Sequence, residues 1–182
     1  MTGAAVLLGG DFHIGRQLLG PLDFQAAAAF LLPLFGLFAL STALAEVLPA
    51  FAELKKLFQE QLVPQLRVIP VWGLAVMAVG AGVGEEALFR GLLQTWLTAA
   101  LPLSSADQAA AAGVAAASLV FGALHALNPA YFCFATAAGL VFGVEYLVAG
   151  LPAAAATHAV YDFAAFLLTI RMWGGQSSKP DS

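Results

Sequence analysis

The main shortage in this 182-residue sequence is of charged side chains. Asp, Glu, Lys and Arg make up 10% of the residues, whereas they account for about a quarter of an ordinary soluble domain. Hydrophobic residues make up 61%. A soluble globular protein is excluded because too few polar side chains remain to cover its surface. Disorder is excluded because disordered chains combine low hydrophobicity with high charge. The composition therefore predicts an integral membrane protein.

Cysteine and basic residues are also scarce. The single cysteine, Cys133, excludes a disulfide framework and a cysteine-based zinc site. Lys and Arg total 7 against 11 acidic residues, which gives a net charge of −4. A nucleic-acid-binding protein needs a basic face, which so few basic residues cannot form. The lipid bilayer is an expected partner, and nucleic acid is not.

Stretches without Asp, Glu, Lys or Arg indicate where the chain crosses the membrane. Residues 24–45 form one, long enough to span a hydrocarbon core about 30 Å thick as a helix. Residues 108–144 form the longest, and Pro129 divides it. The apolar content is too uniform for the alternation of a β-barrel, so the fold class is all-α, a polytopic transmembrane helical bundle. The expected spans here lie at about 24–45, 107–127, 130–149 and 151–170.

The segment 68–101 needs a separate interpretation. As one helix it would be about 50 Å long at 1.5 Å per residue, too long for one upright crossing. Gly80, Gly82 and Gly84 lie in its middle. We expect them to divide it into a membrane helix and a second, tilted or partly re-entrant helix that begins near Glu85. The bundle should then have five or six membrane helices.

A polar connector, residues 46–67, follows the first span. Charged residues such as Glu53 and Lys55 are mixed there with Phe and Leu, which predicts an amphipathic helix in the membrane interface. We favour a plain interfacial linker, and the alternative is a role in gating substrate. The predicted organisation is an N-terminal tail, first membrane helix and connector over 1–67, a membrane core over 68–171, and a disordered polar tail over 172–182.

Ionisable residues inside membrane helices cost about 2.5–3.5 kcal/mol each near the helix centre and need a partner or a function. Three sets interrupt the apolar core, and each has a spacing of four that places its end residues on one helix face. These sets are Glu86-x-x-x-Arg90 with the preceding Glu85, Phe121-x-x-x-His125, and His158-x-x-x-Asp162. Each alone has a structural explanation, but buried together they would form one polar site, which in a membrane bundle is functional by default.

The spacing also predicts pairings. Glu86 and Arg90 can form an ion pair with the acid before the base, which leaves Glu85 without a local partner. Asp162 can accept a hydrogen bond from one ring nitrogen of His158, and this fixes the tautomer and leaves the other nitrogen free.

Two other acidic residues lie in the core. Asp107 follows Ser105 and fits a helix N-terminus. Glu145 lies just before Gly150 at the end of a span. We favour a position for Glu145 at the membrane interface, and the alternative is that it lines the cavity.

In their order, spacing and placement on apolar helices, the three sets resemble the motifs of the CPBP intramembrane protease family. This family includes type II CAAX prenyl endopeptidases and bacterial bacteriocin-processing or immunity proteins. The resemblance covers about residues 80–170. It implies a glutamate-dependent intramembrane endopeptidase, a peptide hydrolase that needs no metal cofactor.

The resemblance also implies residue roles. Glu85 and His125 would hold and activate a water molecule, and His158 with the residue at 162 would stabilise the oxyanion. The family has Asn or Asp at this last position. Because an ionised carboxylate cannot donate a hydrogen bond, we prefer for Asp162 the role of orienting His158. The residues expected to support these four are Glu86, Arg90, Phe121 and Asn128.

Attack by water suits this sequence better than a covalent acyl-enzyme. No Ser or Cys lies beside a motif histidine, and we interpret Cys133, eight residues after His125, as a core residue.

Three other functions remain open. His125, His158 and a carboxylate could bind zinc with an open fourth position, as in a zinc-dependent membrane protease, although the sequence has no His-Glu-x-x-His helix. The protein could instead be a non-catalytic membrane scaffold or immunity protein. A proton-coupled transporter is disfavoured because the chain lacks paired halves.

The expected partner is a membrane-associated protein or peptide substrate, with a C-terminal sorting tail or a lipidated C-terminus as the options that the resemblance implies. The expected location, by analogy with the family, is the bacterial cytoplasmic (inner) membrane.

Overall fold

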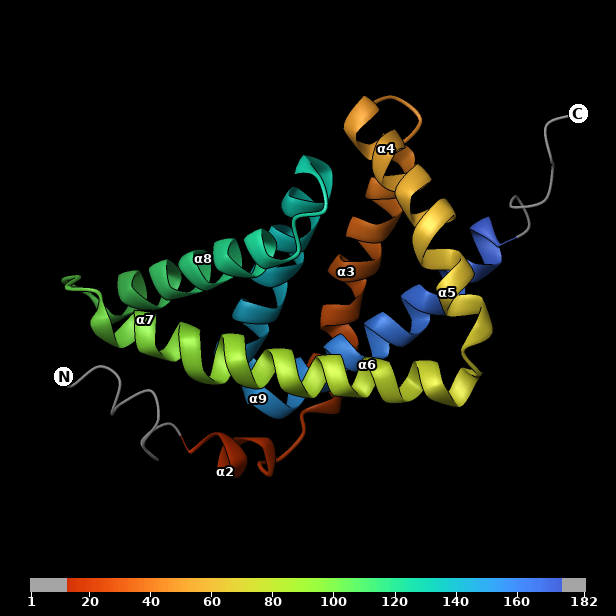
Figure 1. Ribbon diagram of the computed structural model, residues 1–182. Coiled ribbons are helices and arrows are strands. Elements are labelled where there is room, and N and C mark those ends of the chain that lie inside the picture. Colours follow the sequence, from red (N-terminus) through yellow and green to blue (C-terminus); the bar gives the residue numbers. More distant parts are fainter. Residues whose placement is uncertain (1–12, 175–182) are drawn as a thin grey trace, which may run out of the picture.

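The computed structural model describes residues 13–174, and this part of the chain contains helices and no strand. Figure 1 shows the long helices running in several directions rather than as one parallel bundle. The elements in chain order are α2 (Ile14–Leu18), α3 (Phe24–Leu44), α4 (Pro49–Leu57), the π-helical η1 (Phe58–Leu62), α5 (Val63–Val68), α6 (Val71–Glu86), the π-helical η2 (Ala87–Gln94), α7 (Thr95–Ala100), α8 (Ala106–Leu124) and α9 (Pro129–Trp173). The predicted all-helical membrane bundle is confirmed.

Within residues 13–174, four helical stretches are long and apolar enough to cross a membrane. They are Phe24–Leu44, Val71–Ala100, Ala106–Leu124 and Pro129–Trp173. The last is 45 residues long, but Gly150 inside it has a φ of 81° and a ψ of 176°. This conformation is open essentially only to glycine, and it bends α9 into two halves. If the two halves of α9 are counted separately, the four stretches become five spans, the lower of the two expected numbers.

The expectation for segment 68–101 was wrong. Instead of breaking at its glycines, the chain continues from α6 through η2 into α7 as one long rod, visible across the lower part of Figure 1. A Cβ atom on Gly82 would lie 2.7 Å from the carbonyl oxygen of Ala155 and from the amide nitrogen of Ala159. Gly82 therefore serves close packing of α6 against α9, and no second helix begins at Glu85.

The connector folds into α4, η1 and α5, which pack against both ends of α9. Its buried side chains include Leu54, Val63 and Leu66, while Lys56 and Glu60 are exposed, so the predicted amphipathic pattern is present. Two long-range hydrogen bonds attach the connector to the remainder of the bundle. Asn128 Nδ2 donates to the carbonyl oxygen of Ala50 at 2.9 Å, and Arg67 Nη1 donates to that of Gly174 at 2.7 Å.

An ion pair closes the turn between α3 and α4. Lys55 Nζ lies 2.8 Å from Glu46 Oε1. The hydrogen bond from Lys55 and the attraction of its charge lower the pKa of the exposed Glu46 carboxyl, so this pair persists across the neutral pH range.

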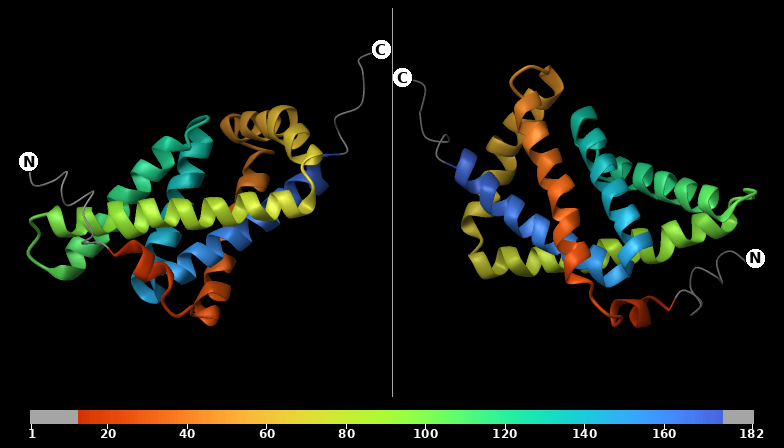
Figure 2. Two further views of the ribbon diagram at one scale, coloured as in Figure 1. Left: turned by 60° about the horizontal axis from the view of Figure 1, so that its bottom comes forward. Right: turned by 180° about the vertical axis from the view of Figure 1, so that it is seen from behind.

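Two apolar clusters join the long helices. In one, Leu34 of α3 packs against both halves of α9 through Phe142 and Tyr161. In the other, Phe89 of η2 and Phe121 of α8 meet with their rings edge to face, 4.9 Å between centroids. Leu34 is the only buried residue of α3, and Figure 2 shows this helix crossing α9 on the rear side. Apolar side chains that point outward are typical of a lipid-facing helix.

The predicted tail begins close to the end of the last helix. α9 extends to Trp173, so residues 172 and 173 are helical. The remainder of the predicted tail, residues 175–182, lies outside the described residues.

Candidate active site

The bundle brings the three polar sets of the sequence to one place. Glu85 and Glu86 lie at the end of α6 and Arg90 lies one turn later in η2, where the helix widens. His125 directly follows the end of α8. His158 and Asp162 face the same region from the second half of α9. Segments up to 77 positions apart therefore contribute to one cluster.

The Glu85 carboxylate lies between two imidazole rings. Its Oε2 atom is 3.6 Å from His125 Nε2 and 3.9 Å from His158 Nε2. The side chains of Glu85 and His125 are 32% and 28% exposed, so both reach the cavity described below. A carboxylate beside an accessible ring nitrogen is an arrangement that can take a proton from a small molecule such as water.

Behind Glu85 lies a fully buried ion pair. Glu86 and Arg90 are both 0% exposed, with 3.2 Å between Glu86 Oε2 and Arg90 Nε, as the spacing of four predicted. Arg90 Nη2 also donates to the carbonyl oxygen of Gly139 at 3.1 Å. The guanidinium lies 5.2 Å from the ring centroid of Phe121, a distance at which a cation is attracted to the aromatic face.

Two carboxylates, Glu86 and Asp162, contact the ring of His158. Glu86 Oε1 is 2.8 Å from His158 Nδ1, and Phe142 stacks on the ring with 4.4 Å between centroids. Asp162 lies beside the other nitrogen, with 3.5 Å between its Oδ2 atom and His158 Nε2. The spacing of four brought Asp162 to the ring as expected. The contact to Nδ1 comes from Glu86 of α6, 72 positions away in the chain. Residue spacing within one helix could not predict it.

His125 is held by its own helix end. Its Nδ1 atom lies 2.8 Å from the carbonyl oxygen of Phe121, and its ring stacks on the Phe121 ring at 4.2 Å. Because a carbonyl oxygen only accepts, Nδ1 carries a hydrogen, and Nε2 faces Glu85. Asn128 caps α9 by accepting from the amide of Tyr131 at 2.8 Å. Asn128 therefore holds the turn that follows His125, and through Ala50 it also holds the connector. Neither of these hydrogen bonds involves a carboxylate of the cluster.

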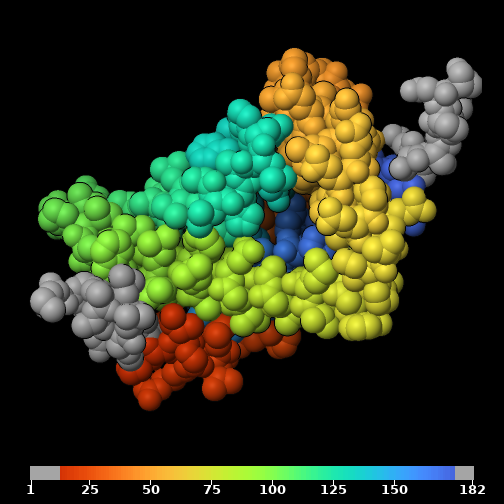
Figure 3. Space-filling model, viewed as in Figure 1, coloured from red at the N-terminus to blue at the C-terminus, as the bar shows by residue number. Residues whose placement is uncertain are grey.

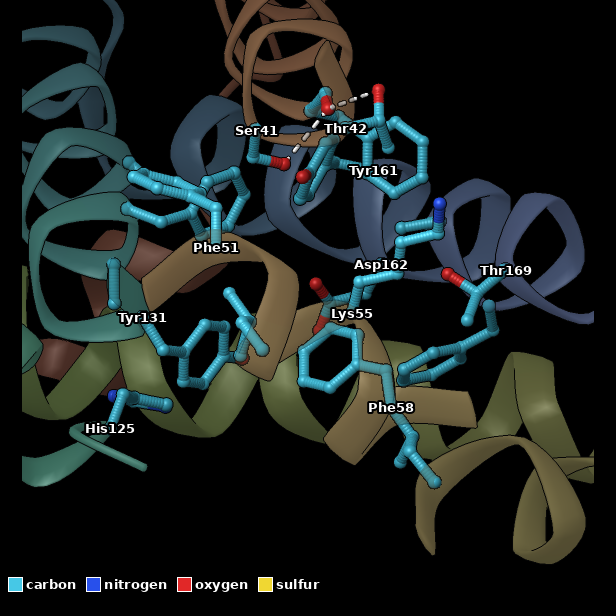
Figure 4. A pocket seen from close by; sticks show the side chains of 18 of the residues that line it. Ser41, Thr42, Phe51, Lys55, Phe58, His125, Tyr131, Tyr161, Asp162 and Thr169 are labelled. Atoms are coloured by element: carbon cyan, nitrogen blue, oxygen red, sulfur yellow. Dashed lines mark hydrogen bonds between the residues drawn. The ribbon is translucent and has the colours of Figure 1, made fainter. Parts of the chain in front are cut away.

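A cavity of about 160 Å³ opens beside these groups. Figure 3 shows the hollow between the connector and the turn from α8 to α9, with the second half of α9 at its floor. In Figure 4 the labelled side chains of α3, the connector and α9 surround one space that His125 and Asp162 also reach. Residues of α3 and the connector that sequence reasoning did not assign to the site include Ser41, Thr42, Phe51, Lys55 and Phe58. For the connector residues the only signal was the amphipathic pattern, which we interpreted as a plain linker, and the sequence held no signal for Ser41 and Thr42 of α3.

Two further expectations were wrong. Glu145 is 0% exposed and hydrogen-bonds to Thr157 inside the bundle, so it lies neither at the interface nor in the lining of the cavity. Cys133 is exposed on α9 and is not a core residue. In both cases the helix face that points inward depends on the packing of α9, which local composition does not determine.

Within residues 13–174, no group of three or more His, Cys, Asp or Glu side chains has a geometry that would hold a metal ion.

Buried and partly buried carboxylates are thus grouped around two histidines inside an apolar helical bundle, an arrangement typical of a functional site in a membrane protein. A protein-family model described as "Type II CAAX prenyl endopeptidase Rce1-like" matches residues 67–164, which is more than half of the chain. The chain belongs to this Rce1-like family, and the resemblance expected from its motifs is confirmed. Members of this family are CAAX-type intramembrane proteases that act on membrane-associated prenylated proteins. No curated protein and no solved structure matches significantly.

Proposed function

We propose that this protein is a glutamic intramembrane endopeptidase in which Glu85 and His125 activate water for attack on a peptide bond. The observation that carries the proposal is the Glu85 carboxylate, which is partly exposed to the cavity and faces the Nε2 atoms of His125 and His158 at 3.6 and 3.9 Å. Both gaps exceed a direct hydrogen bond of about 2.7–3.2 Å, and all three side chains line the cavity, so a water molecule in the cavity can approach Glu85 and His125 together.

In the first step, a water molecule donates one hydrogen bond to Glu85 and the other to Nε2 of His125. Glu85 takes a proton while the water oxygen forms a bond to the carbonyl carbon of the substrate. General base help of this kind contributes about 10²–10⁴ in rate. The negative charge that develops moves to the carbonyl oxygen of the substrate.

His158 stabilises that charge. Carboxylates face both of its ring nitrogens, Glu86 at Nδ1 and Asp162 at Nε2, and this favours a ring protonated on both, so that Nε2 can donate to the oxyanion. One such donor is worth about 10²–10³ in rate. The carbon–nitrogen bond then breaks, and Glu85 returns its proton to the departing amine. The buried Arg90 balances the charge of Glu86 throughout.

The substrate is a membrane-associated protein, which is cut near a C-terminal sorting tail or a lipidated C-terminus. The enzyme acts in the bacterial cytoplasmic (inner) membrane. The aromatic lining of the cavity, which includes Phe51, Phe58, Tyr131 and Tyr161, supports a substrate segment that is largely apolar. No metal takes part in the proposed reaction.

The test compares cells that carry the wild-type protein, the Glu85→Gln variant and, as a matched control, Glu60→Gln on the exposed face of the connector. One precursor should accumulate uncut in the membrane proteome of the Glu85→Gln strain and in neither of the others. With the precursor in hand, the purified enzyme is assayed before and after treatment with a strong chelator. We expect unchanged cleavage after chelation.

Two results would contradict the proposal. Activity that is lost on chelation and restored by zinc would indicate a zinc-dependent protease at the same site. Normal processing in a strain whose Glu85→Gln protein is inserted at wild-type levels would indicate a scaffold or immunity protein.

A further inference from the structure

A buried carboxyl group lies outside the catalytic cluster. Glu145, in the first half of α9, is 0% exposed, and its Oε1 atom is 2.5 Å from the hydroxyl oxygen of Thr157. Thr157 lies after the bend at Gly150, in the second half of α9. Its hydroxyl oxygen is also 3.2 Å from the carbonyl oxygen of Ala27 in α3. The two halves of α9 and helix α3 therefore meet at one hydroxyl group.

A count of hydrogen atoms at this junction indicates the protonation state of Glu145. The Thr157 hydroxyl has one hydrogen to donate, and the carbonyl oxygen of Ala27 can only accept. When Thr157 donates to Ala27, the hydrogen between Thr157 and Glu145 has to come from Glu145, which must then be a carboxylic acid. An ionised Glu145 would compete with the part-buried carbonyl oxygen of Ala27 for the one hydrogen, whereas a neutral Glu145 allows both contacts of the Thr157 hydroxyl to be hydrogen bonds.

The surroundings of Glu145 favour the same state. Helix α3 has no charged side chain, and Glu145 has no ion pair in the described part of the chain. Two titratable groups act on it through space, Glu86 from α6 and His158 from its own helix, and these are engaged with each other at 2.8 Å. Glu145 Oε2 is buried and has no hydrogen-bond partner. An isolated charge in such a place is strongly unfavourable.

We propose that Glu145 is a neutral carboxylic acid that donates a hydrogen bond to Thr157 and acts as a positioning residue for the reaction. Thr157 directly precedes His158, and Phe142, three positions before Glu145, stacks on the His158 ring. The link across the bend therefore fixes the second half of α9 relative to the first, and holds His158 between Glu86 and Phe142. This inference rests on the proposed function, because His158 is assigned there to the oxyanion.

Matched substitutions test the donor and the link. Glu145→Gln keeps a donor at this position, and Glu145→Leu has a similar volume without one. We expect wild-type kcat for Glu145→Gln, and a kcat lowered on the order of 10- to 100-fold with a similar KM for Glu145→Leu, since small displacements of catalytic groups cost about this much. Thr157→Ser and Thr157→Val form a second pair in case Glu145→Leu does not fold. We expect the kcat of Thr157→Ser to stay near wild type and that of Thr157→Val to fall.

The pH profile separates this role from a merely structural one. Because the neutral acid is the competent form, wild-type activity should fall at high pH as Glu145 loses its proton. The Glu145→Gln variant should lack that fall. Equal impairment of Glu145→Gln and Glu145→Leu would overturn the donor assignment, and wild-type kcat in Glu145→Leu and Thr157→Val would overturn the positioning role.

A measurement without turnover keeps this inference distinct from the proposed function. In the inactive Glu85→Gln background, infrared spectroscopy at neutral pH should detect the carbonyl band of a protonated carboxylic acid, and the band should disappear when Glu145→Gln is added. No loss of such a band would show that Glu145 is ionised, whatever reaction the protein performs.

Discussion

Two carboxylates that are adjacent in sequence have different surroundings. Glu85 is about one third exposed and faces the cavity, whereas Glu86 is fully buried between Arg90 and His158. A helix turns each successive residue by about 100°, so neighbours point to different sides. In the proposed reaction this separation leaves Glu85 to exchange protons with the substrate, while Glu86 stays in contact with Arg90 and His158.

Glu86→Gln should destabilise the protein strongly. The amide cannot balance the charge of Arg90, and removal of one partner from a buried ion pair typically costs about 3–5 kcal/mol. We expect a clear fall in the thermal midpoint in mild detergent. Glu60→Gln is the matched control, because Glu60 pairs with Lys56 at 3.8 Å and both side chains are mostly exposed, so its midpoint should barely move. Equal midpoints for the two variants would show that the buried pair does not stabilise the fold.

Helix α6 depends on close contact with α9 at a single glycine. Gly82→Ala should destabilise the bundle by about 1–3 kcal/mol, the usual cost of overpacking, because its Cβ would meet backbone atoms of Ala155 and Ala159 at 2.7 Å. Gly84→Ala, two residues later, has open space around the new Cβ and should be neutral or slightly stabilising, since alanine favours helix. Thermal midpoints of the two variants in the same detergent give the comparison. A midpoint for Gly82→Ala no lower than that of Gly84→Ala would contradict this packing.

The elements also show what could be predicted from the sequence. The pair Glu86–Arg90 was predictable because its four-residue spacing is fixed by helix geometry, and the spans were predictable because charge is excluded from lipid. The contact from Glu86 to His158 was not, because it depends on how α6 crosses α9. The same holds for Gly82, since an apolar segment with three glycines fits both a broken helix and a closely packed one.

At the scale of the whole molecule, the cavity is assembled from segments that lie far apart in the chain. Phe58 of the connector lies between the two ends of α9, with its ring centroid 5.5 Å from that of Tyr131 and 6.3 Å from that of Trp173. All three side chains line the cavity. The connector, which the sequence presented as a linker, thus forms one wall of the cavity beside the proposed catalytic residues, and its aromatic side chains should contact the bound substrate.

Phe58→Ala should therefore weaken substrate binding while leaving the chemistry intact. Burial of a phenylalanine side chain is worth about 1.5–3 kcal/mol, and 1.4 kcal/mol is tenfold in affinity, so KM should rise about tenfold or more. The value of kcat should change far less, because Glu85, His125 and His158 keep their mutual contacts. Phe24→Ala is the control, since Phe24 is 76% exposed on α3 and does not line the cavity. A loss of kcat at constant KM would mean that Phe58 supports the catalytic geometry instead of contacting substrate, and wild-type values for both would place the substrate elsewhere.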